Sequence, residues 1–265
     1  NSIFILGMVF GIGFTQGLTP HVGQSYGRGD HSRVGLLLEN SLTLNFIAGL
    51  LLTSAMFGMG FLMNNMGQTE DVVIQGKLYY NTLLFSLLPF IVFFGLRQFS
   101  EGIGITKYAM YITLFANAVN IILNWALIYG HLGFSPMGVK GAALATLISR
   151  VIMLIAFLAL FIKLEPYNRY LKHFSRKFIN KEILSDVLKT SVPLSFQNLV
   201  EITAFSLSAI MVGWSGKVSL AAHQVAMSMS SFSFMLALGV GAASTIRVSH
   251  QYGFGDYVAM RKAGF

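Results

Sequence analysis

The chain of 265 residues contains no cysteine. This absence excludes disulfide bonds, thiolate metal sites and redox motifs. Charged residues are also scarce, since they make up 11% of the sequence, whereas soluble domains carry about 25%. A water-soluble globule of this length would lack the charge to cover its surface. The composition therefore excludes that class, together with disordered chains and coiled coils.

The sequence instead contains long hydrophobic runs: 54% of its residues are hydrophobic, and its mean hydropathy is +0.66. A bilayer core about 30 Å thick needs about 20 apolar residues in helical form. Seven segments reach that length and are expected to be transmembrane helices: 2–26, 35–63, 78–100, 108–129, 138–164, 192–214 and 219–251. The sequence therefore predicts an all-α polytopic membrane protein.

Most basic residues lie in the links between these spans, and the links alternate in charge. Of the 18 Lys and Arg, fourteen fall at one face, three fall at the opposite face, and Arg150 lies inside a span. Cytoplasmic links carry the excess of Lys and Arg, so the first face is expected to be cytoplasmic, in an inner membrane. The net charge of +8 follows from this topology and does not indicate nucleic acid as a partner.

The long basic link divides the chain. Three regions are predicted, namely an N-terminal bundle, a cytoplasmic linker and the start of a second bundle: 1–164, 165–190 and 191–265. Segment 181–190 places its apolar residues on one face, as expected of a helix that lies along the membrane surface. Ser191 and Pro193 then fit the beginning of the next spanning helix.

A short pattern occurs at the ends of the first and the last span: Tyr26-Gly27-Arg28-Gly29-Asp30 and Tyr252-Gly253-Phe254-Gly255-Asp256. At this offset of 226 residues, seven of the 18 positions from 13 to 30 are identical. Both copies end on the same side, as in the parallel repeats of two-bundle transporters. The second copy follows a span that the first lacks. We therefore expect a parent with twelve spans, of which this chain holds the second to the eighth.

Several stretches, taken in order, resemble the multidrug and toxic compound extrusion (MATE) family: 18–27, 97–108, 120–125, 138–146, 192–201, 221–226 and 244–248. The resemblance covers most of the chain. It implies two six-helix bundles around a central cavity, in a membrane antiporter that is not an enzyme and has no cofactor. Such a protein exports amphipathic, mostly cationic drugs or toxins in exchange for Na⁺ or H⁺, and we expect it to be monomeric. In the NorM-like branch a seventh-helix glutamate is tied to cation binding, and Glu201 stands at that place.

Glu201 is the one carboxylate well inside a predicted span. A charge at that depth costs at least about 2.5–3.5 kcal/mol, so it must be paired, hydrated or neutral. It is expected to bind Na⁺ or a proton, or else to be a structural group satisfied by Gln197 or by a neighbouring helix. The amides expected to assist it, unless they only link helices, are Asn120, Asn124, Gln197 and Asn198. His223 and Gln224, at the start of the last span, either line the outer mouth of a substrate cavity or lie in the membrane interface.

Two other functions are weighed. The segments 27–30 and 253–256 each match the short Gly-x-Gly-Asp motif of intramembrane aspartyl proteases. Their positions at span ends, beside arginines, favour a turn in which Gly stops one helix and Asp caps the next. The nearer alternative is a flippase for lipid-linked precursors in the same superfamily, whose cavity would be richer in Arg for binding pyrophosphate.

The charge asymmetry predicts that 165–190 faces the cytoplasm. A single cysteine introduced as Lys177→Cys gives one labelling site, because the chain has no other thiol. We expect a membrane-impermeant maleimide to label this cysteine only after the cells are opened. Ready labelling from outside intact cells would show that the topology is inverted.

Overall fold

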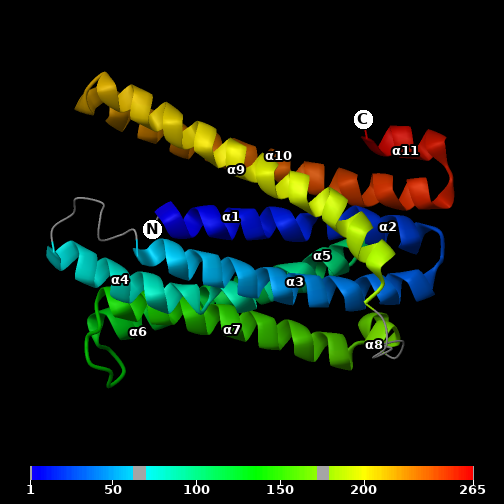
Figure 1. Cartoon of the computed structure of the whole chain (residues 1–265), viewed down its shortest axis with the longest axis horizontal. Coiled ribbons are helices and arrows are strands. Elements are labelled where there is room, and N and C mark those ends of the chain that lie inside the picture. Colours follow the sequence, from blue (N-terminus) through cyan, green and yellow to red (C-terminus); the bar gives the residue numbers. More distant parts are fainter. Residues whose placement is uncertain (1, 62–69, 172–178, 265) are drawn as a thin grey trace.

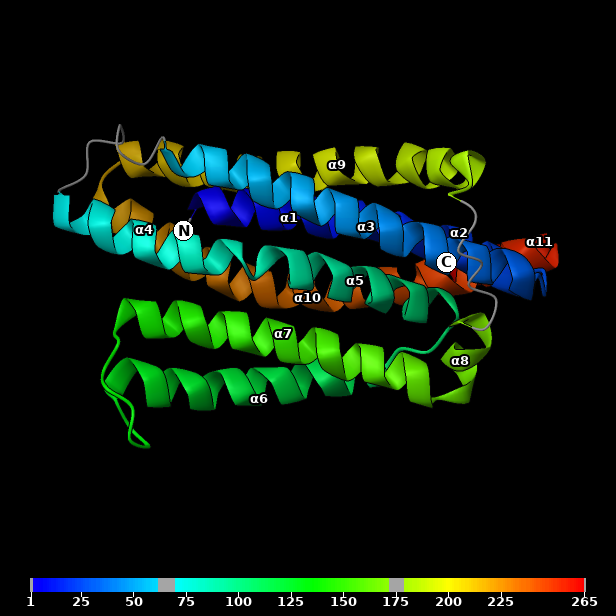
Figure 2. The same cartoon turned by 60° about the horizontal axis from the view of Figure 1, so that its bottom comes forward.

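The computed structural model describes residues 2–61, 70–171 and 179–264. All regular structure in these residues is helical, in this order: α1 (Ser2–Gln16), α2 (Leu18–Gly27), α3 (His31–Gly60), α4 (Glu70–Leu84), α5 (Leu87–Gly102), α6 (Lys107–Tyr129), α7 (Val139–Lys163), α8 (Glu165–Leu171), α9 (Lys181–Trp214), α10 (Lys217–Phe254) and α11 (Tyr257–Gly264). The long helices lie side by side along the longest axis of the molecule (Figures 1 and 2). The predicted all-helical architecture is confirmed.

Five helices of the described part are long and apolar enough to cross a membrane: α3, α6, α7, α9 and α10. A sixth span forms if Gly76–Leu84 and α5 are taken together across their bend of 41°. The predicted span 2–26 is divided between α1, with 15 residues, and α2, with 10. The structure thus has five or six spans by length and composition where the sequence predicts seven, and the difference comes from interrupted helices.

Each interruption lies about four residues before a proline. α1 ends at Gln16, four residues before Pro20, and α4 ends just before Phe85, four residues before Pro89. Because proline has no N–H, the carbonyl four positions earlier receives no helical hydrogen bond, and the proline ring crowds that carbonyl. A span interrupted in this way remains apolar along its length, which is why hydropathy alone predicts it as continuous.

α9 differs from the prediction at its beginning. It begins at Lys181, where the side chain of Asn180 accepts hydrogen bonds from the first-turn N–H groups at 2.9 and 3.4 Å. With its first amides capped in this way, the helix continues through Pro193. The predicted helix start at Ser191 and Pro193 is therefore wrong. The position of 181–190 at the membrane surface and the division of the chain into two bundles stay predictions.

A short helix that the sequence did not predict, α8, anchors the linker to the first bundle. Its Tyr167 is fully buried and stacks on Phe161 with ring centroids 4.4 Å apart. The hydroxyl groups of Tyr167 and Ser100 form a hydrogen bond of 2.6 Å. Burial raises the pKa of the Tyr167 phenol above its usual value, so the hydroxyl stays protonated. The linker therefore begins as packed structure.

The repeated pattern forms the same turn twice. Gly29 and Gly255 are both left-handed, with φ of 73° and 78°, a conformation that glycine reaches without steric cost. Asp30 and Asp256 then cap the helices that follow, each accepting from the backbone N–H three residues later at 2.9 Å. The interpretation of Gly as helix stop and Asp as helix cap is confirmed.

The two copies also pack on each other, because the ends of α2 and α10 lie side by side (Figure 1). A methyl group at Gly27 would collide with the carbonyl oxygen of His250, and one at Gly253 would collide with that of Gln24. These two contacts interchange under the offset of 226 residues, as the contacts of a two-fold interface do. We call this surface the α2–α10 seam. It confirms that the sequence repeat is a structural repeat.

Neighbouring contacts extend the seam. A methyl group at Gly23 would lie 2.7 Å from the Cβ of Ser249, the residue that corresponds to Gly23 under the same offset. On the other side, Nε2 of His250 lies 2.7 Å from the carbonyl oxygen of Gly102, at the end of α5. The seam is thus held between α2, α10 and the first bundle.

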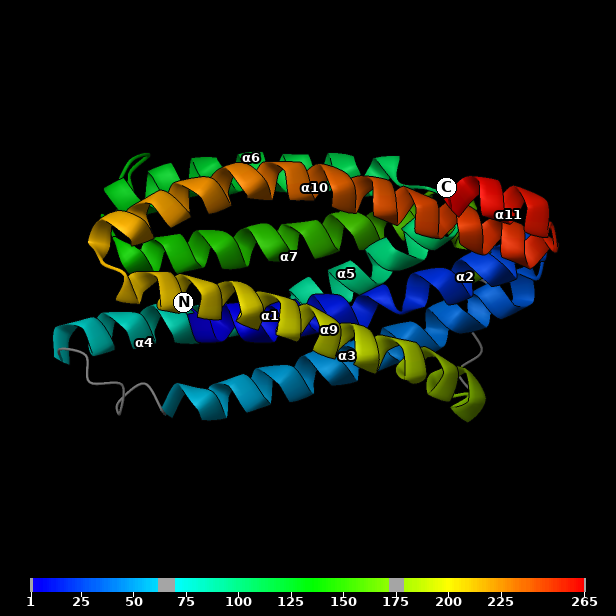
Figure 3. The ribbon, with the colours of Figure 1, turned by 90° about the horizontal axis from the view of Figure 1, so that it is seen from above.

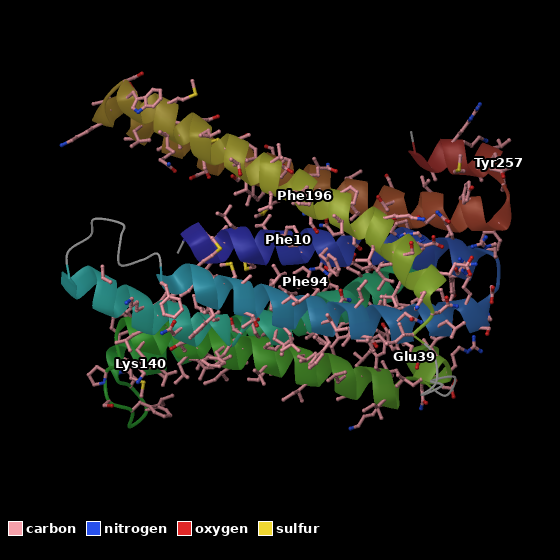
Figure 4. All side chains as sticks on the ribbon, in the orientation of Figure 1. Phe10, Glu39, Phe94, Lys140, Phe196 and Tyr257 are labelled. Carbon is pink, nitrogen blue, oxygen red and sulfur yellow. The ribbon has the colours of Figure 1, made fainter. Side chains whose placement is uncertain are left out.

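The basic and the poorly basic links lie at opposite ends of the molecule. The α2–α3 turn, α8 and α11 lie at one end, while the α6–α7 and α9–α10 links lie at the other (Figure 1). Figure 4 shows Lys140 far from Glu39 and Tyr257 along the same axis. This segregation is the one that the charge pattern predicts. Lys177 and its neighbours over 172–178 lie outside the described residues.

The seam predicts a matched set of destabilising substitutions. Gly27→Ala and Gly253→Ala should each weaken the protein, by about 1–3 kcal/mol, because overpacking pushes two backbones apart. Gly58→Ala is the control, since nothing lies within 4 Å of that position in the described chain. The measurement is the thermal unfolding midpoint of the purified protein. A Gly253→Ala midpoint as high as that of Gly58→Ala would contradict the close approach.

Candidate ion-coupling and substrate sites

Small residues bring α1 and α9 into close contact. A methyl group at Gly13 would lie 2.7 Å from the Cα of Ser195, and one at Gly17 would lie 2.7 Å from the Cα of Ser191. The order of these contacts shows that the two helices run antiparallel. Farther along, Phe10 and Phe196 meet edge to face with centroids 5.8 Å apart (Figure 4). Close backbone approach of this kind is typical of helix pairs in membranes.

One predicted site residue finds its partner across this contact. Nδ2 of Asn198 donates to Oε1 of Gln16 at 3.3 Å. Gln16 is the last residue of α1, where the helix is interrupted before Pro20. The helix interruption and the glycines therefore bring the amide of Gln16, on α1, against the amide of Asn198, on α9.

Glu201 lies three residues beyond Asn198 on α9 and is half-buried. Residues three apart are neighbours on a helix surface, so the carboxylate is adjacent to the amide pair. It makes no hydrogen bond or ion pair with any residue that the structure describes. Gln197, which was considered as its structural partner, is exposed and has no hydrogen-bond partner within the described ranges.

The two asparagines of α6 lie elsewhere. Nδ2 of Asn124 donates to Oδ1 of Asn120 at 3.0 Å. α6 packs against α7, on the side of the bundle away from α9 (Figures 1 and 2). Within the described chain, Asn120 and Asn124 are not brought together with Glu201, and their part in coupling stays a prediction.

His223 and Gln224 lie near the start of α10, at the end with few basic links (Figure 3). His223 is half-buried, and its Nε2 has no hydrogen-bond partner among the described residues. Gln224 is exposed. Neither residue lines the pocket that lies between α5, α6 and α7.

A pocket of about 250 Å³ lies between α5, α6 and α7. Its wall combines two arginines, aromatic rings and amides, including Arg97, Arg150, Phe90, Phe94, Asn117 and Asn120. The pocket is therefore a second polar site, separate from Glu201. It contains one of the predicted residues, Asn120.

The family described as MatE has a model that matches this chain over residues 1–126 and 193–265. The chain belongs to this family, the MATE transporters.

MATE relatives match along nearly the whole chain. The probable multidrug resistance protein NorM of Bradyrhizobium diazoefficiens is 30% identical over 267 residues, which cover 100% of this chain and 57% of that protein. The multidrug resistance protein NorM of Vibrio cholerae is 30% identical over 257 residues, covering 96% and 56%. This chain thus spans little more than half the length of these relatives.

Solved MATE structures share the fold. A crystal structure of MATE in complex with MaD5 aligns with a TM-score of 0.88 at 24% identity, over 99% of this chain and 59% of the other. An outward-facing multidrug resistance MATE transporter of the MOP superfamily aligns at 0.81 and 22% identity, over 98% and 57%. The prediction that this chain is an all-helical part of a MATE transporter fold is confirmed.

Sequence reasoning missed Gln16 and the pairing of two arginines in one pocket. Gln16 carries the same signal that identified Asn198, a polar side chain inside an apolar run. The sequence places Arg150 inside one predicted span and Arg97 near the end of another, and Arg97 lies within α5. Only the packing of α5 against α7 shows that both guanidinium groups face the same space.

Proposed function

We propose that the protein that carries this chain is an ion-coupled antiporter that exports amphipathic, mostly cationic compounds in exchange for Na⁺ or H⁺. Membership in the MATE family and the NorM relatives, which are named multidrug resistance proteins, support drug export. Its substrates are small molecules, and its place is the inner membrane, with several spans.

The coupling proposal is based on Glu201. It is a carboxylate within a membrane-spanning helix, without a hydrogen bond or ion pair in the described residues. Ionisable groups in such positions usually serve ion or proton pathways. The adjacent pair of Gln16 and Asn198 supplies amide oxygens of the kind that hard cations accept as ligands. A carboxylate with amide neighbours suits Na⁺ binding, and the carboxylate alone suits a proton.

Coupling also requires two conformations that the driving ion can distinguish. The α2–α10 seam joins the two repeats at the end with basic links, while α9 and α10 diverge from α1 toward the other end (Figure 1). This arrangement supports a transporter in which one end is closed by contact between the repeats. Opening that end would separate Gly27 from Gly253.

The flippase alternative has less support. The relatives named here are multidrug resistance proteins. Arg97, which lines the pocket between α5, α6 and α7, is already paired with Glu101, Nε to Oε1, at 2.6 Å. Ethidium efflux and translocation of a lipid-linked precursor, assayed in the same vesicles, distinguish the two functions.

The coupling proposal predicts that Glu201→Gln abolishes ion-driven efflux in the full-length protein. The amide keeps the shape of the side chain but cannot be charged or take up a proton at neutral pH. Glu201→Asp should retain part of the activity, because the charge survives on a shorter side chain. The measurement is dye efflux from proteoliposomes under an imposed Na⁺ gradient and, separately, an imposed H⁺ gradient, which also identifies the ion.

Glu182→Gln is the matched control, since Glu182 is an exposed carboxylate in the first turn of the same helix. It should respond to the gradient like the parent. A Glu201→Gln protein that inserts normally and still responds like the parent would show that Glu201 is structural.

A further inference from the structure

One side chain of α10 reaches across the α2–α10 seam to the end of α5. Nε2 of His250 lies 2.7 Å from the carbonyl oxygen of Gly102, the last residue of α5. Its imidazole ring lies against the phenol ring of Tyr26, on α2, with ring centroids 5.2 Å apart. A single residue of the second repeat thus contacts two helices of the first bundle.

This hydrogen bond completes the capping of α5. The last carbonyl groups of a helix find no partner within the helix itself. The carbonyl groups of 99–101 accept from backbone N–H groups of the turn that follows α5, and that of Gly102 accepts from His250. Because a carbonyl oxygen can only accept, Nε2 must carry the proton of the ring. His250 therefore supplies to Gly102 the donor that the turn supplies to the three residues before it.

Glycines leave the space that the imidazole ring fills. A methyl group at Gly104 would lie 3.3 Å from Cε1 of His250, and one at Gly23 would lie 3.4 Å from its Cδ2. A methyl group at Gly27 would collide with the carbonyl oxygen of the same histidine. These three glycines and Gly102 form a recess on the first bundle, which we call the glycine notch. It fits a ring that carries one N–H donor.

Other polar contacts between the repeats at this end go to the start of α9. Arg33 and Asp186 lie 3.9 Å apart, with side chains 46% and 41% exposed, so water screens the pair and it stabilises little. Nε2 of His21 lies 2.9 Å from Oγ1 of Thr190. His250 differs from these residues because it lies on α10, the helix that forms the seam.

We propose that His250 and the glycine notch form a latch that holds the end with basic links closed, and that the latch is released when this end opens. The proposal rests on the proposed function, because a transporter exposes its site to each side of the membrane in turn. To open this end, α10 must move away from α2, and the same movement draws the imidazole out of the notch. His250 is thus a positioning residue, which acts through the place of α10.

The latch has a strength that a transporter can overcome. The hydrogen bond of His250 to Gly102 changes the balance between two states by about fivefold, and a buried carbonyl group left without a donor adds to that factor. An ion or substrate that prefers the open state by a larger factor can therefore release the latch. A latch of this size sets the resting balance without preventing transport.

Two spin labels measure the opening in the purified full-length protein, with any cysteine outside this chain replaced. Arg28→Cys and Phe254→Cys place the labels on exposed residues on opposite sides of the seam, at positions that correspond under the offset of 226 residues. Pulsed electron paramagnetic resonance in lipid nanodiscs gives the distances between the labels, without substrate and without an ion gradient. In the parent we expect the short distance of the closed end to dominate.

Variants at His250 assign the closure to the latch. His250→Ala removes the ring and the donor, so it should raise the ratio of long to short distances by at least about fivefold. His250→Phe keeps a ring in the notch but has no N–H donor, and it should raise the ratio as well. His250→Gln should stay closer to the parent, because its amide N–H can replace that of Nε2. Glutamine is also the corresponding residue of the first repeat, Gln24.

His131→Ala is the matched control, since it removes an exposed histidine in the α6–α7 link, at the opposite end of the molecule (Figure 1). Its distance distribution should equal that of the parent. Because the substitution is the same as in His250→Ala, a difference between the two variants reports the place of the histidine.

Three results would overturn the latch: a His250→Ala distribution equal to that of His131→Ala, a His250→Gln protein as open as His250→Ala, or a parent in which the long distance already dominates. If His250→Ala does not accumulate, His250→Phe and His250→Gln are compared instead. Equal distributions of these two would show that the donor to Gly102 does not hold the end closed.

The latch and the proposed function can fail separately. The distance measurement needs neither a drug nor a driving ion, so the latch can be refuted while Glu201→Gln still abolishes ion-driven efflux. Conversely, a protein that exports no dye under either gradient refutes the proposed function, and the response of its distances to the His250 variants still decides on the latch.

Discussion

Close approach of backbones at glycine is the constraint on which the arrangement of this chain depends. In lipid, helices gain little from burying apolar side chains, so contact between small residues determines which helices can meet. At the α2–α10 seam, Gly27 and Gly253 meet carbonyl oxygens of the opposite helix so closely that neither position has room for a methyl group. At the α1–α9 contact, Gly13 and Gly17 lie so close to the backbone of α9 that a methyl group would not fit there either. The second repeat packs against the first mainly through these two contacts.

Prolines have the complementary role, since they interrupt spans and thereby place polar groups. The interruption before Pro20 leaves Gln16 at the end of α1, within reach of Asn198. The interruption before Pro89 leaves Ser86 between α4 and α5, within reach of Arg150. In each case the proline leaves one backbone carbonyl without its helical hydrogen bond. The polar residue at or directly after that carbonyl contacts another helix. Helix breaks and candidate sites therefore coincide in this protein.

Glu201 and Arg150, two ionisable groups within spanning helices, lie in different parts of the structure and differ in sign. Glu201 is on α9, in the second repeat, beside amides. Arg150 is on α7, in the first bundle, beside aromatic rings. A carboxylate beside amide oxygens suits a small cation or a proton, whereas the guanidinium group is held by aromatic rings and a hydroxyl group. The described part of the chain thus gives these two ionisable groups different surroundings.

Features that depend on local composition could be predicted from the sequence: the helical membrane class, the segregation of basic links, the Gly-stop and Asp-cap turns, and the repeat. Hydropathy, charge and turn chemistry are properties of short segments, so they are visible without a structure. The packing of the helices determines which polar residues meet. It separated Asn120 and Asn124 from Glu201, paired Gln16 with Asn198, and placed Arg97 and Arg150 in one pocket. Such pairings depend on helix interruptions and on close backbone contacts between segments far apart in the sequence, so no single segment encodes them.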